Sequence, residues 1–175
     1  MSFHIEDGGR DLDALLAEGF SIEGSGWKER RGTAIASQER TRRHYTEIAR
    51  WAARRGSLRL AFLRLDGRPV AFQFALEENR RYYFVKGGYA TEYARFAVGK
   101  LLVRFTLEYA FSRHLDSYEF LGAADLWKLE WTDTVRERVL FEAFTRSPAG
   151  LLSRAMRTAS VRGRALVTRV LRRVR

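Results

Sequence analysis

The chain has 175 residues, which suits one domain large enough to bury a core without disulfides. A hydrophobic content of 46% and an aromatic content of 13% indicate a globular protein and exclude a disordered one. The sequence contains no cysteine, which excludes disulfides, thiol nucleophiles and cysteine-ligated zinc.

The net charge of +11 is concentrated in the C-terminal segment. From Pro148 onward the sequence has eight arginines and no Asp or Glu, which leaves about +3 for residues 1–147. The main part of the chain therefore has no charge signature of nucleic-acid binding. The first residues lack the basic and apolar regions of a signal peptide, and no apolar run approaches the ~18 residues of a membrane span. We expect a cytoplasmic protein.

The N-terminal part is expected to be helical. Residues 1–10 look too short and polar to form a good strand, and residues 11–17 have the pattern of a short amphipathic helix. Glycines then mark a loop around Trp27 and Lys28. A second, arginine-rich helix is predicted over residues 38–55, where apolar residues recur at helical spacing.

An antiparallel β-meander is predicted next. Residues 58–65 and 70–76 have the composition of strands, and Asp66-Gly67 between them is a strong signal for a hairpin turn. A third strand is expected over residues 81–88, which are rich in aromatic and β-branched residues.

The segment after the meander predicts a helical crossover and a parallel strand. Residues 98–114 are apolar on most sides, which is typical of a helix buried against a sheet. Residues 117–121 form a short strand signal, and a strand that follows a crossover helix pairs parallel with an earlier one. A short helix over residues 123–131 and a closing strand over residues 136–145 complete the pattern. The expected fold class is a mixed α/β (α+β) sheet around a central helix.

The C-terminal segment is expected to be a separate basic amphipathic helix. Pro148 suits the first helical position, and apolar residues then repeat at helical spacing among the arginines. Such a helix can lie on an anionic membrane surface, contact RNA or a partner, or fold back on the domain. We therefore divide the chain into a domain of residues 1–147 and a helix of residues 148–175.

The turn between the third strand and the long helix has the form of an anion site. Ala97, Val98 and Gly99 open the helix with no Pro or Asp, and a helix N-terminus presents free backbone N–H groups. Arg95 and Lys100 add positive charge beside it. The alternative is an ordinary entry into a helix.

Several stretches, taken in order, carry a resemblance to a known family. They are Gly26–Lys28 with Gly32–Ile35 behind it, Leu60–Phe72, Tyr89–Gly99 and Gly122–Trp131. Together with the order of elements, they resemble the Gcn5-related N-acetyltransferase (GNAT) fold. More narrowly, they resemble the GNAT branch of CelD/BcsL-type proteins of exopolysaccharide synthesis and FemAB-like aminoacyltransferases. The resemblance covers roughly residues 20–147.

The resemblance implies an acyl-CoA donor held at the start of the long helix. The family pattern there is Gln or Arg, two residues, Gly, one residue, then Gly or Ala, and Ala94–Gly99 keeps only the last glycine. On this resemblance, acetyl-CoA or another acyl-CoA is held by Arg95, Ala97, Val98, Gly99, Lys100 and Leu101.

The resemblance also implies direct attack of an amine on a thioester. This reaction needs a base for the ammonium proton, donors for the thioester oxygen and an acid for the leaving thiolate. Many relatives use a tyrosine as that acid, but this chain has Trp127 and Lys128 in the comparable place. Lys128 is the candidate proton donor. Asp125, just past a parallel strand, is the candidate base, with a helix N-cap as its alternative role.

Trp27, Lys28 and Tyr89 are the candidates for binding the acceptor. The resemblance places the glycine-rich loop beside the acceptor, and Tyr89 precedes the phosphate turn. For both aromatic residues the alternative is a role in core packing. No metal site is expected.

The predicted function is an acyl-CoA-dependent N-acyltransferase acting on an amine of a small molecule or of a cell-envelope or polysaccharide precursor. Two alternatives stay open: a FemAB-like transferase that uses aminoacyl-tRNA, and a non-catalytic GNAT scaffold that lacks the first glycine and the tyrosine. FemAB-like proteins contain two GNAT halves, and this chain resembles a C-terminal half. A homodimer that completes the pair is therefore a further hypothesis.

Overall fold

The computed structural model describes residues 1–9, 11–25, 35, 38–137, 139 and 141–173, and the side chains up to residue 160. Contacts divide the chain into two units, Met1–Trp131 and Thr132–Arg175, and each is described by itself. The domain boundary after residue 147 stays a prediction.

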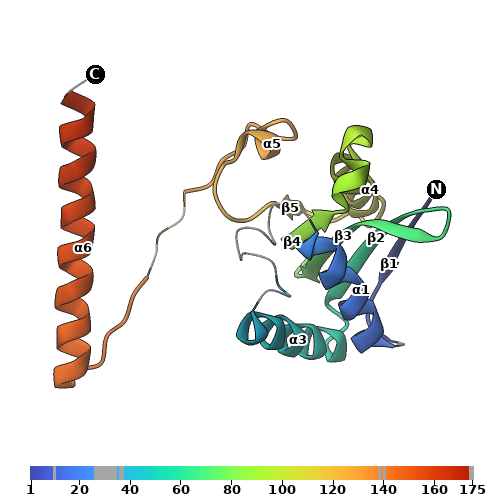
Figure 1. Ribbon diagram of the computed structural model, residues 1–175. Coiled ribbons are helices and arrows are strands. Elements are labelled where there is room, and N and C mark those ends of the chain that lie inside the picture. Colours follow the sequence, from blue (N-terminus) through green and yellow to red (C-terminus); the bar gives the residue numbers. More distant parts are fainter. Residues whose placement is uncertain (10, 26–34, 36–37, 138, 140, 174–175) are drawn as a thin grey trace. The chain divides into compact units, whose positions relative to one another are not determined.

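The first unit is built on one five-stranded sheet with the strand order β1-β2-β3-β4-β5 (Figure 1). The strands are β1 (Ser2–Glu6), β2 (Leu58–Leu65), β3 (Arg68–Glu78), β4 (Arg81–Tyr89) and β5 (Ser117–Glu119). The first four are antiparallel neighbours, whereas β5 runs parallel to β4. This mixed sheet confirms the predicted fold class.

Both turns of the meander follow from the local sequence. Asp66 and Gly67 have φ angles of 49° and 79°, and Asn79 and Arg80 have φ angles of 51° and 57°. Positive φ at both central residues is the mark of a type I′ turn, whose twist matches that of the flanking strands. The hairpin predicted from Asp-Gly is therefore confirmed.

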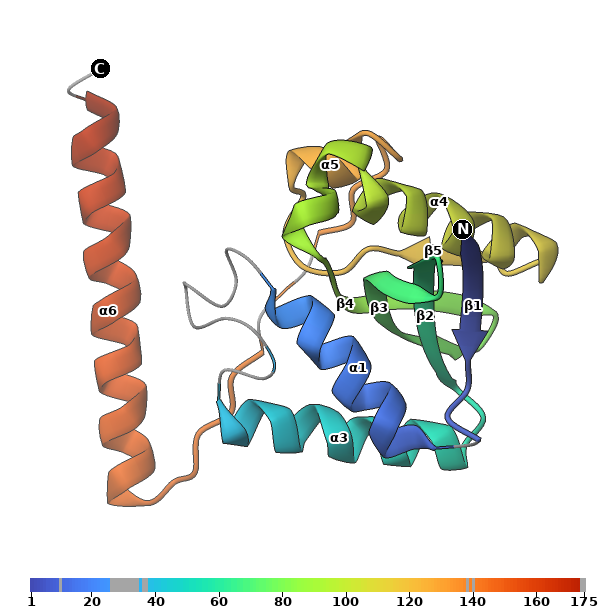
Figure 2. The ribbon, with the colours of Figure 1, turned by 45° about the vertical axis from the view of Figure 1, so that its right-hand side comes forward.

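Helices cover both faces of the sheet (Figure 2). They are α1 (Leu12–Gly24) and α3 (Glu39–Arg54) on one face, and α4 (Val98–Ser112), preceded by the 3-10 helix η2 (Thr91–Phe96), on the other. Side chains alternate along a strand, so Leu60 and Phe62 of β2 face α1 and α3 while Ala61 and Leu63 face α4. All four are buried, as expected for a strand covered on both faces.

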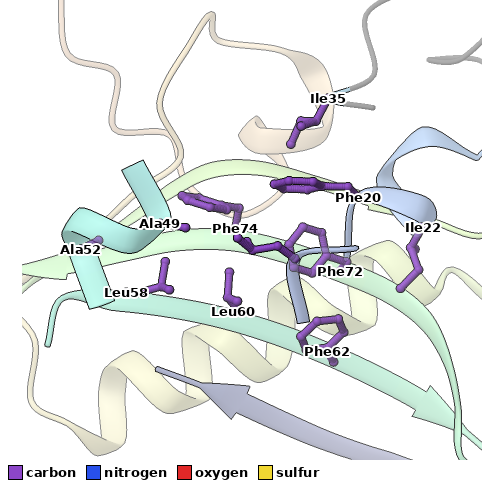
Figure 3. Close-up of a cluster of buried hydrophobic side chains, with 11 residues drawn as sticks. Phe20, Ile22, Ile35, Ala49, Ala52, Leu58, Leu60, Phe62, Phe72 and Phe74 are labelled. Carbon is purple, nitrogen blue, oxygen red and sulfur yellow. The ribbon is translucent and has the colours of Figure 1, made fainter. Parts of the chain in front are cut away.

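The larger core lies between the sheet and the pair α1 and α3 (Figure 3). The ring centroids of Phe62 and Phe72 lie 5.1 Å apart, and Phe20 packs edge-on against Phe72 at 6.4 Å. On the opposite face, α4 packs through Val98 and Leu102. The buried apolar helix expected from the sequence is therefore present.

The N-terminal residues form a strand, contrary to the expectation from their polarity. Strand β1 pairs antiparallel with β2, and its side chains alternate between exposed and half-buried. Phe3 and Ile5 pack on the α4 side of the sheet, where the Phe3 ring stacks on Phe105 at 5.2 Å. Two apolar residues at a spacing of two suffice here because the neighbouring β2 supplies the pairing.

Two further expectations need correction. The first helix does not end at residue 17 but continues to Gly24, because Phe20 and Ile22 are buried against the sheet. The prediction of a closing strand over residues 136–145 is wrong, since none of the described residues in this range is in a strand. Val139 and Phe141 are instead exposed. A β-like composition does not make a strand without a partner edge.

The remaining elements are both helical. The short helix after β5 is present as α5 (Leu126–Leu129). The second unit contains α6 (Pro148–Arg173), which begins where the sequence predicts and runs through Gly163 without a break. Its Leu151, Leu152 and Met156 side chains are exposed. No helix in the described parts of the chain is long and apolar enough to span a membrane.

Candidate active site

Strand β4 has two strand neighbours only over its first residues. Arg81–Tyr83 pair with Ser117–Glu119 of β5, and the parallel ladder stops there. Over Phe84–Tyr89, only β3 pairs with β4 in the described part of the sheet. We call Phe84–Tyr89 the open edge. Backbone groups along such an edge are able to bond a ligand that lies alongside the strand.

A β-bulge lies within the open edge. Phe84 is opposite Ala75 and Lys86 is opposite Phe74, so Val85 is an extra residue on β4. A bulge bends its strand and redirects the side chains that follow. The bulge therefore marks the point where β4 departs from β5.

The start of α4 is a free helix N-terminus next to this edge. Ala97 precedes it in the left-handed conformation, with φ 51° and ψ 34°, and no side chain of the described residues caps the helix. The first N–H group with an intrahelical acceptor is that of Leu101, which donates to the Ala97 carbonyl. The N–H groups of Val98, Gly99 and Lys100 therefore point to the helix end, where the helix dipole favours an anion.

Gly99 brings this helix end against the end of β4. A Cβ atom at Gly99 would lie 2.8 Å from Cδ1 of Tyr89, closer than real Cβ contacts come. A side chain at position 99 would therefore require the Tyr89 ring to move, and this close approach joins the open edge to the predicted anion site. We call the N–H groups of Val98, Gly99 and Lys100 the cradle.

The predicted donor-binding residues differ in what they offer. Ala97 donates its N–H to the Ala94 carbonyl and Leu101 donates its own to Ala97, so neither N–H is available for an anion. The Lys100 ammonium lies 2.5 Å from a Glu130 carboxylate oxygen. The Arg95 guanidinium stacks over the Phe96 ring at 4.6 Å. Their roles in donor binding stay predictions.

The two predicted catalytic residues are paired with each other. Lys128 Nζ lies 2.8 Å from Asp125 Oδ2 and donates to the carbonyls of Leu121 at 2.9 Å and Ala123 at 2.7 Å. An ammonium has three donors, so these contacts engage all of them. Asp125 sits at the N-cap position of α5 but makes no capping hydrogen bond. Lys128 thus holds the loop after β5 together, and the catalytic roles of both residues stay predictions.

The acceptor-binding candidates are divided between described and undescribed residues. Tyr89 lies at the end of the open edge and is 39% exposed, so a ligand is able to reach it. Trp27 and Lys28 lie outside the described residues.

A buried polar cluster that the sequence analysis missed joins β3, α4 and β5. The Tyr118 hydroxyl lies 2.9 Å from both Gln73 Nε2 and Thr106 Oγ1. Burial raises the pKa of Tyr118 to about 12, although both hydrogen bonds oppose the shift. The phenol therefore stays protonated and acts as a hydrogen-bonding group. A lone glutamine in the apolar strand Val70–Leu76 was the available signal.

A second missed group is the buried carboxylate of Glu23. Its Oε2 accepts the backbone N–H of Ile35 at 2.8 Å, and its Oε1 lies 3.6 Å from Lys86 Nζ on β4. The same ammonium lies 5.9 Å from the Tyr45 ring centroid. Burial, and then the Glu23 charge, raise the pKa of Tyr45. This group fixes the end of α1 to the open edge just past the bulge.

Charged residues at the opposite end of the sheet form a third cluster. Glu77 Oε2 accepts hydrogen bonds from Tyr109 at 2.7 Å and from Arg59 at 2.9 Å. Burial pushes the pKa of Glu77 upward, but these hydrogen bonds outweigh it and the pKa is lowered. The cluster ties α4 to β2 and β3 and lies away from the cradle.

The model of a family described as an acetyltransferase (GNAT) domain matches residues 1–129. No curated protein sequence matches the chain significantly.

Solved acetyltransferase structures share the fold at low sequence identity. An aminoglycoside 6'-N-acetyltransferase from Acinetobacter haemolyticus aligns with a TM-score of 0.55 and 13% identity, covering 84% of this chain and 100% of that one. The enzyme AAC(6')-Iy, bound to the bisubstrate analogue CoA-S-monomethyl-acetylneamine, aligns with a TM-score of 0.53 and 11% identity over 84% and 100% of the two chains. At these identities the likeness supports the fold alone.

The family match explains the arrangement of cradle and open edge. GNAT acetyltransferases use an acyl-CoA, whose pyrophosphate is an anion and whose arm carries amide groups. The N–H groups at the helix end fit the pyrophosphate. The backbone of β4 past its described pairing with β5 fits the amide groups of the arm. The chain belongs to the GNAT acetyltransferase family and is a GNAT-type N-acetyltransferase with acyl-CoA as its donor.

Proposed function

We propose that this protein transfers an acyl group from acyl-CoA to a primary amine of a small molecule, such as an amino sugar or a cell-envelope or polysaccharide precursor. The observation that carries this proposal is the contact between Gly99 and Tyr89, which joins the cradle to the open edge. An anion bound at the cradle then has its substituent directed along β4. Tyr89 is the described candidate for binding the acceptor amine, and the resemblance adds Trp27 and Lys28 as candidates.

The chain's own groups have defined tasks in this reaction. The amine nitrogen attacks the thioester carbon, the C–S bond breaks, the nitrogen loses a proton and the thiolate gains one. The oxygen of the attacked carbonyl needs hydrogen-bond donors, and backbone N–H groups of β4 are the candidates. Asp125 is half-exposed and able to take the ammonium proton, whereas Lys128 must first release one loop contact to donate a proton.

Binding of acetyl-CoA tests this function directly. Ligand that binds only the folded state at 100 times its Kd stabilises it by about 2.7 kcal/mol, so the melting temperature should rise with acetyl-CoA concentration. Gly99→Val should abolish the rise because its side chain enters the cradle and strikes Tyr89. The double variant Tyr89→Ala/Gly99→Val relieves the clash and controls for misfolding. An intact fold with no shift at millimolar acetyl-CoA would overturn the proposal.

The basic helix α6 motivates a further part of the proposal. The segment from Pro148 onward has eight arginines and no acidic residue, and Leu151, Leu152 and Met156 are exposed. These are the characteristics of a helix that lies on an anionic lipid surface. Such a helix would hold the enzyme at the cytoplasmic face of a membrane, where lipid-linked precursors are acceptors. Binding to anionic vesicles but not to zwitterionic ones is expected. Retention on RNA with a steep salt dependence would favour the FemAB-like, aminoacyl-tRNA-dependent transferase instead.

The non-catalytic scaffold and the homodimer each have a direct test. The paired state of Asp125 and Lys128 favours a scaffold. Release of free CoA in the presence of amines would exclude it. The double-domain architecture of the FemAB-like branch favours a homodimer, which light scattering would distinguish from a monomer.

A further inference from the structure

Three aromatic rings form a wall beside the bulge. The ring centroids of Phe84 and Trp127 lie 5.9 Å apart, those of Phe120 and Trp127 lie 5.8 Å apart, and those of Phe84 and Phe120 lie 6.5 Å apart. Each ring therefore contacts both others at distances typical of aromatic pairs. We call Phe84, Phe120 and Trp127 the aromatic wall.

The wall stands where β4 and β5 separate. Phe84 is the first residue of β4 past the last β5 pair, and Phe120 is the first residue after β5. Trp127 belongs to α5, and the Lys128 ammonium that holds this loop lies 5.4 Å from the Trp127 ring centroid. A Cβ atom added at Gly87 would lie 2.8 Å from Cε2 of Phe84. The Phe84 ring thus lies along the open edge, over Gly87.

The cradle and the wall are at opposite ends of the open edge. Tyr89 touches the start of α4, whereas Phe84 is five residues back along the strand. Because Val85 is an extra residue, these five residues span four ladder positions, or about 13 Å at ~3.3 Å per position. A donor with its pyrophosphate at the cradle and its arm along β4 therefore directs its thioester toward the wall. The acyl group, at the tip of the arm, meets the rings first.

We propose that the aromatic wall restricts the donor to a short acyl group, and that Phe84 is the residue that sets the limit. The inference rests on the proposed donor site and adds the size of the acyl group to it. A longer chain has to displace rings that already contact each other, and forcing added methylenes into packed side chains is unfavourable. The three rings are half-buried or partly exposed, so the acyl group is able to touch them.

Equilibrium binding of CoA, acetyl-CoA and hexanoyl-CoA to the full chain tests the wall without an acceptor. The wild-type protein should bind acetyl-CoA at least about tenfold more tightly than hexanoyl-CoA, at the low end of what a few methylenes can discriminate. Phe84→Ala should reduce this ratio to about twofold or less by opening space beside Gly87, while the Kd of CoA itself stays unchanged. Phe111→Ala is the matched control, since its ring is 78% exposed on α4, and should keep the wild-type ratio.

The outcomes separate the wall from the donor site. Equal affinity of the wild-type protein for acetyl-CoA and hexanoyl-CoA would overturn the wall and leave the donor site standing. No binding of CoA would overturn the donor site, and the wall with it. If Phe84→Ala does not fold, Phe84→Leu and Trp127→Phe enlarge the space by smaller steps. An unchanged ratio in folded forms of both would overturn the role of the wall.

Discussion

Among the described strands, β4 has two neighbours over Arg81–Tyr83 and one over Phe84–Tyr89. The two regions also differ in burial and in ring contacts. In the paired region Tyr82 is fully buried, and its ring stacks on Tyr118 at 4.8 Å. In the open edge the side chains are half-buried or exposed, and among the described strands only β3 pairs with the backbone.

The comparison shows how one strand serves two purposes. The stacked rings of Tyr82 and Tyr118 close the paired region, and the Tyr118 hydroxyl contacts Thr106, so this region anchors the sheet to α4. The open edge has no second neighbour among the described strands, which makes it the candidate side for a ligand. Substitutions in the paired region should therefore reduce stability with little effect on donor affinity.

The largest effect is expected for Tyr82→Ala. Removal of a fully buried aromatic ring should lower the free energy of unfolding by ~3–5 kcal/mol, measured by urea denaturation. The Kd for acetyl-CoA of the folded fraction should change less than about twofold, because the site lies at the other end of the strand. Tyr82→Phe is the matched control. It removes only a hydroxyl that has no hydrogen-bond partner in the described structure, so stability should not fall. A tenfold weaker Kd for Tyr82→Ala would show that the two regions are coupled.

A smaller effect is expected for Glu77→Gln, which breaks the cluster at the paired end. Arg59 and Glu77 are only 13% and 11% exposed, and loss of the carboxylate charge should cost about 1–3 kcal/mol of unfolding free energy. Glu78→Gln is the control next in sequence. Glu78 is 39% exposed and its partner Arg55 is 53% exposed, so this ion pair should contribute below ~1 kcal/mol to the unfolding free energy. If both variants lost the same unfolding free energy, burial would not explain the contribution of the Glu77 cluster.

The same cluster gives a sign for the pH dependence. The folded pKa of Glu77 is below its ordinary value of 4.5, so its contribution is fully present above that value. It should be lost as the pH falls through the folded pKa. Unfolding free energies measured from pH 6 downward should therefore fall less steeply in Glu77→Gln than in the wild-type protein. Parallel curves would exclude this contribution.

The smallest effect is expected for Glu23→Gln at the open edge. Glutamine keeps an oxygen for the Ile35 N–H and loses the charge toward Lys86, which is 23% exposed and able to hydrate. A loss of about 1 kcal/mol in thermal or urea unfolding is expected. Glu18→Gln breaks another pair between α1 and the sheet, with Arg64 at 2.6 Å, away from the open edge. The loss of unfolding free energy in Glu18→Gln should be below ~1 kcal/mol. If the Kd for acetyl-CoA were weaker in Glu18→Gln and unchanged in Glu23→Gln, the assignment of the donor site to the open edge would be contradicted.

Local signals in the sequence predicted most of the fold. Asp66-Gly67 specifies a turn, and the apolar run from Val98 specifies a buried helix, because each depends on residues close in sequence. Strand β1 was missed because its stability comes from β2, far along the chain. The predicted strand over residues 136–145 was wrong because it rested on composition alone, which does not tell whether a neighbouring strand is available for pairing.

The site was predictable only in part. The turn at Val98–Lys100 follows from sequence, but which N–H groups stay free depends on hydrogen bonds made by Ala97 and Leu101. The Glu23 and Lys86 pair joins residues that lie far apart in sequence and meet only in the folded sheet. The pairing of Lys128 with the loop carbonyls was likewise invisible, because spacing alone does not distinguish a proton donor from a structural ammonium.

The extra residue Val85 sets the phase of everything that follows it on β4. Val85 and Lys86 both turn toward α1 and α3, whereas neighbours on a regular strand turn to opposite faces. If Val85 were instead paired as a regular ladder residue, with no bulge, Lys86 would turn away from Glu23 and Tyr89 would turn away from Gly99. The bulge thus keeps the end of β4 facing the start of α4, where the anion site is predicted.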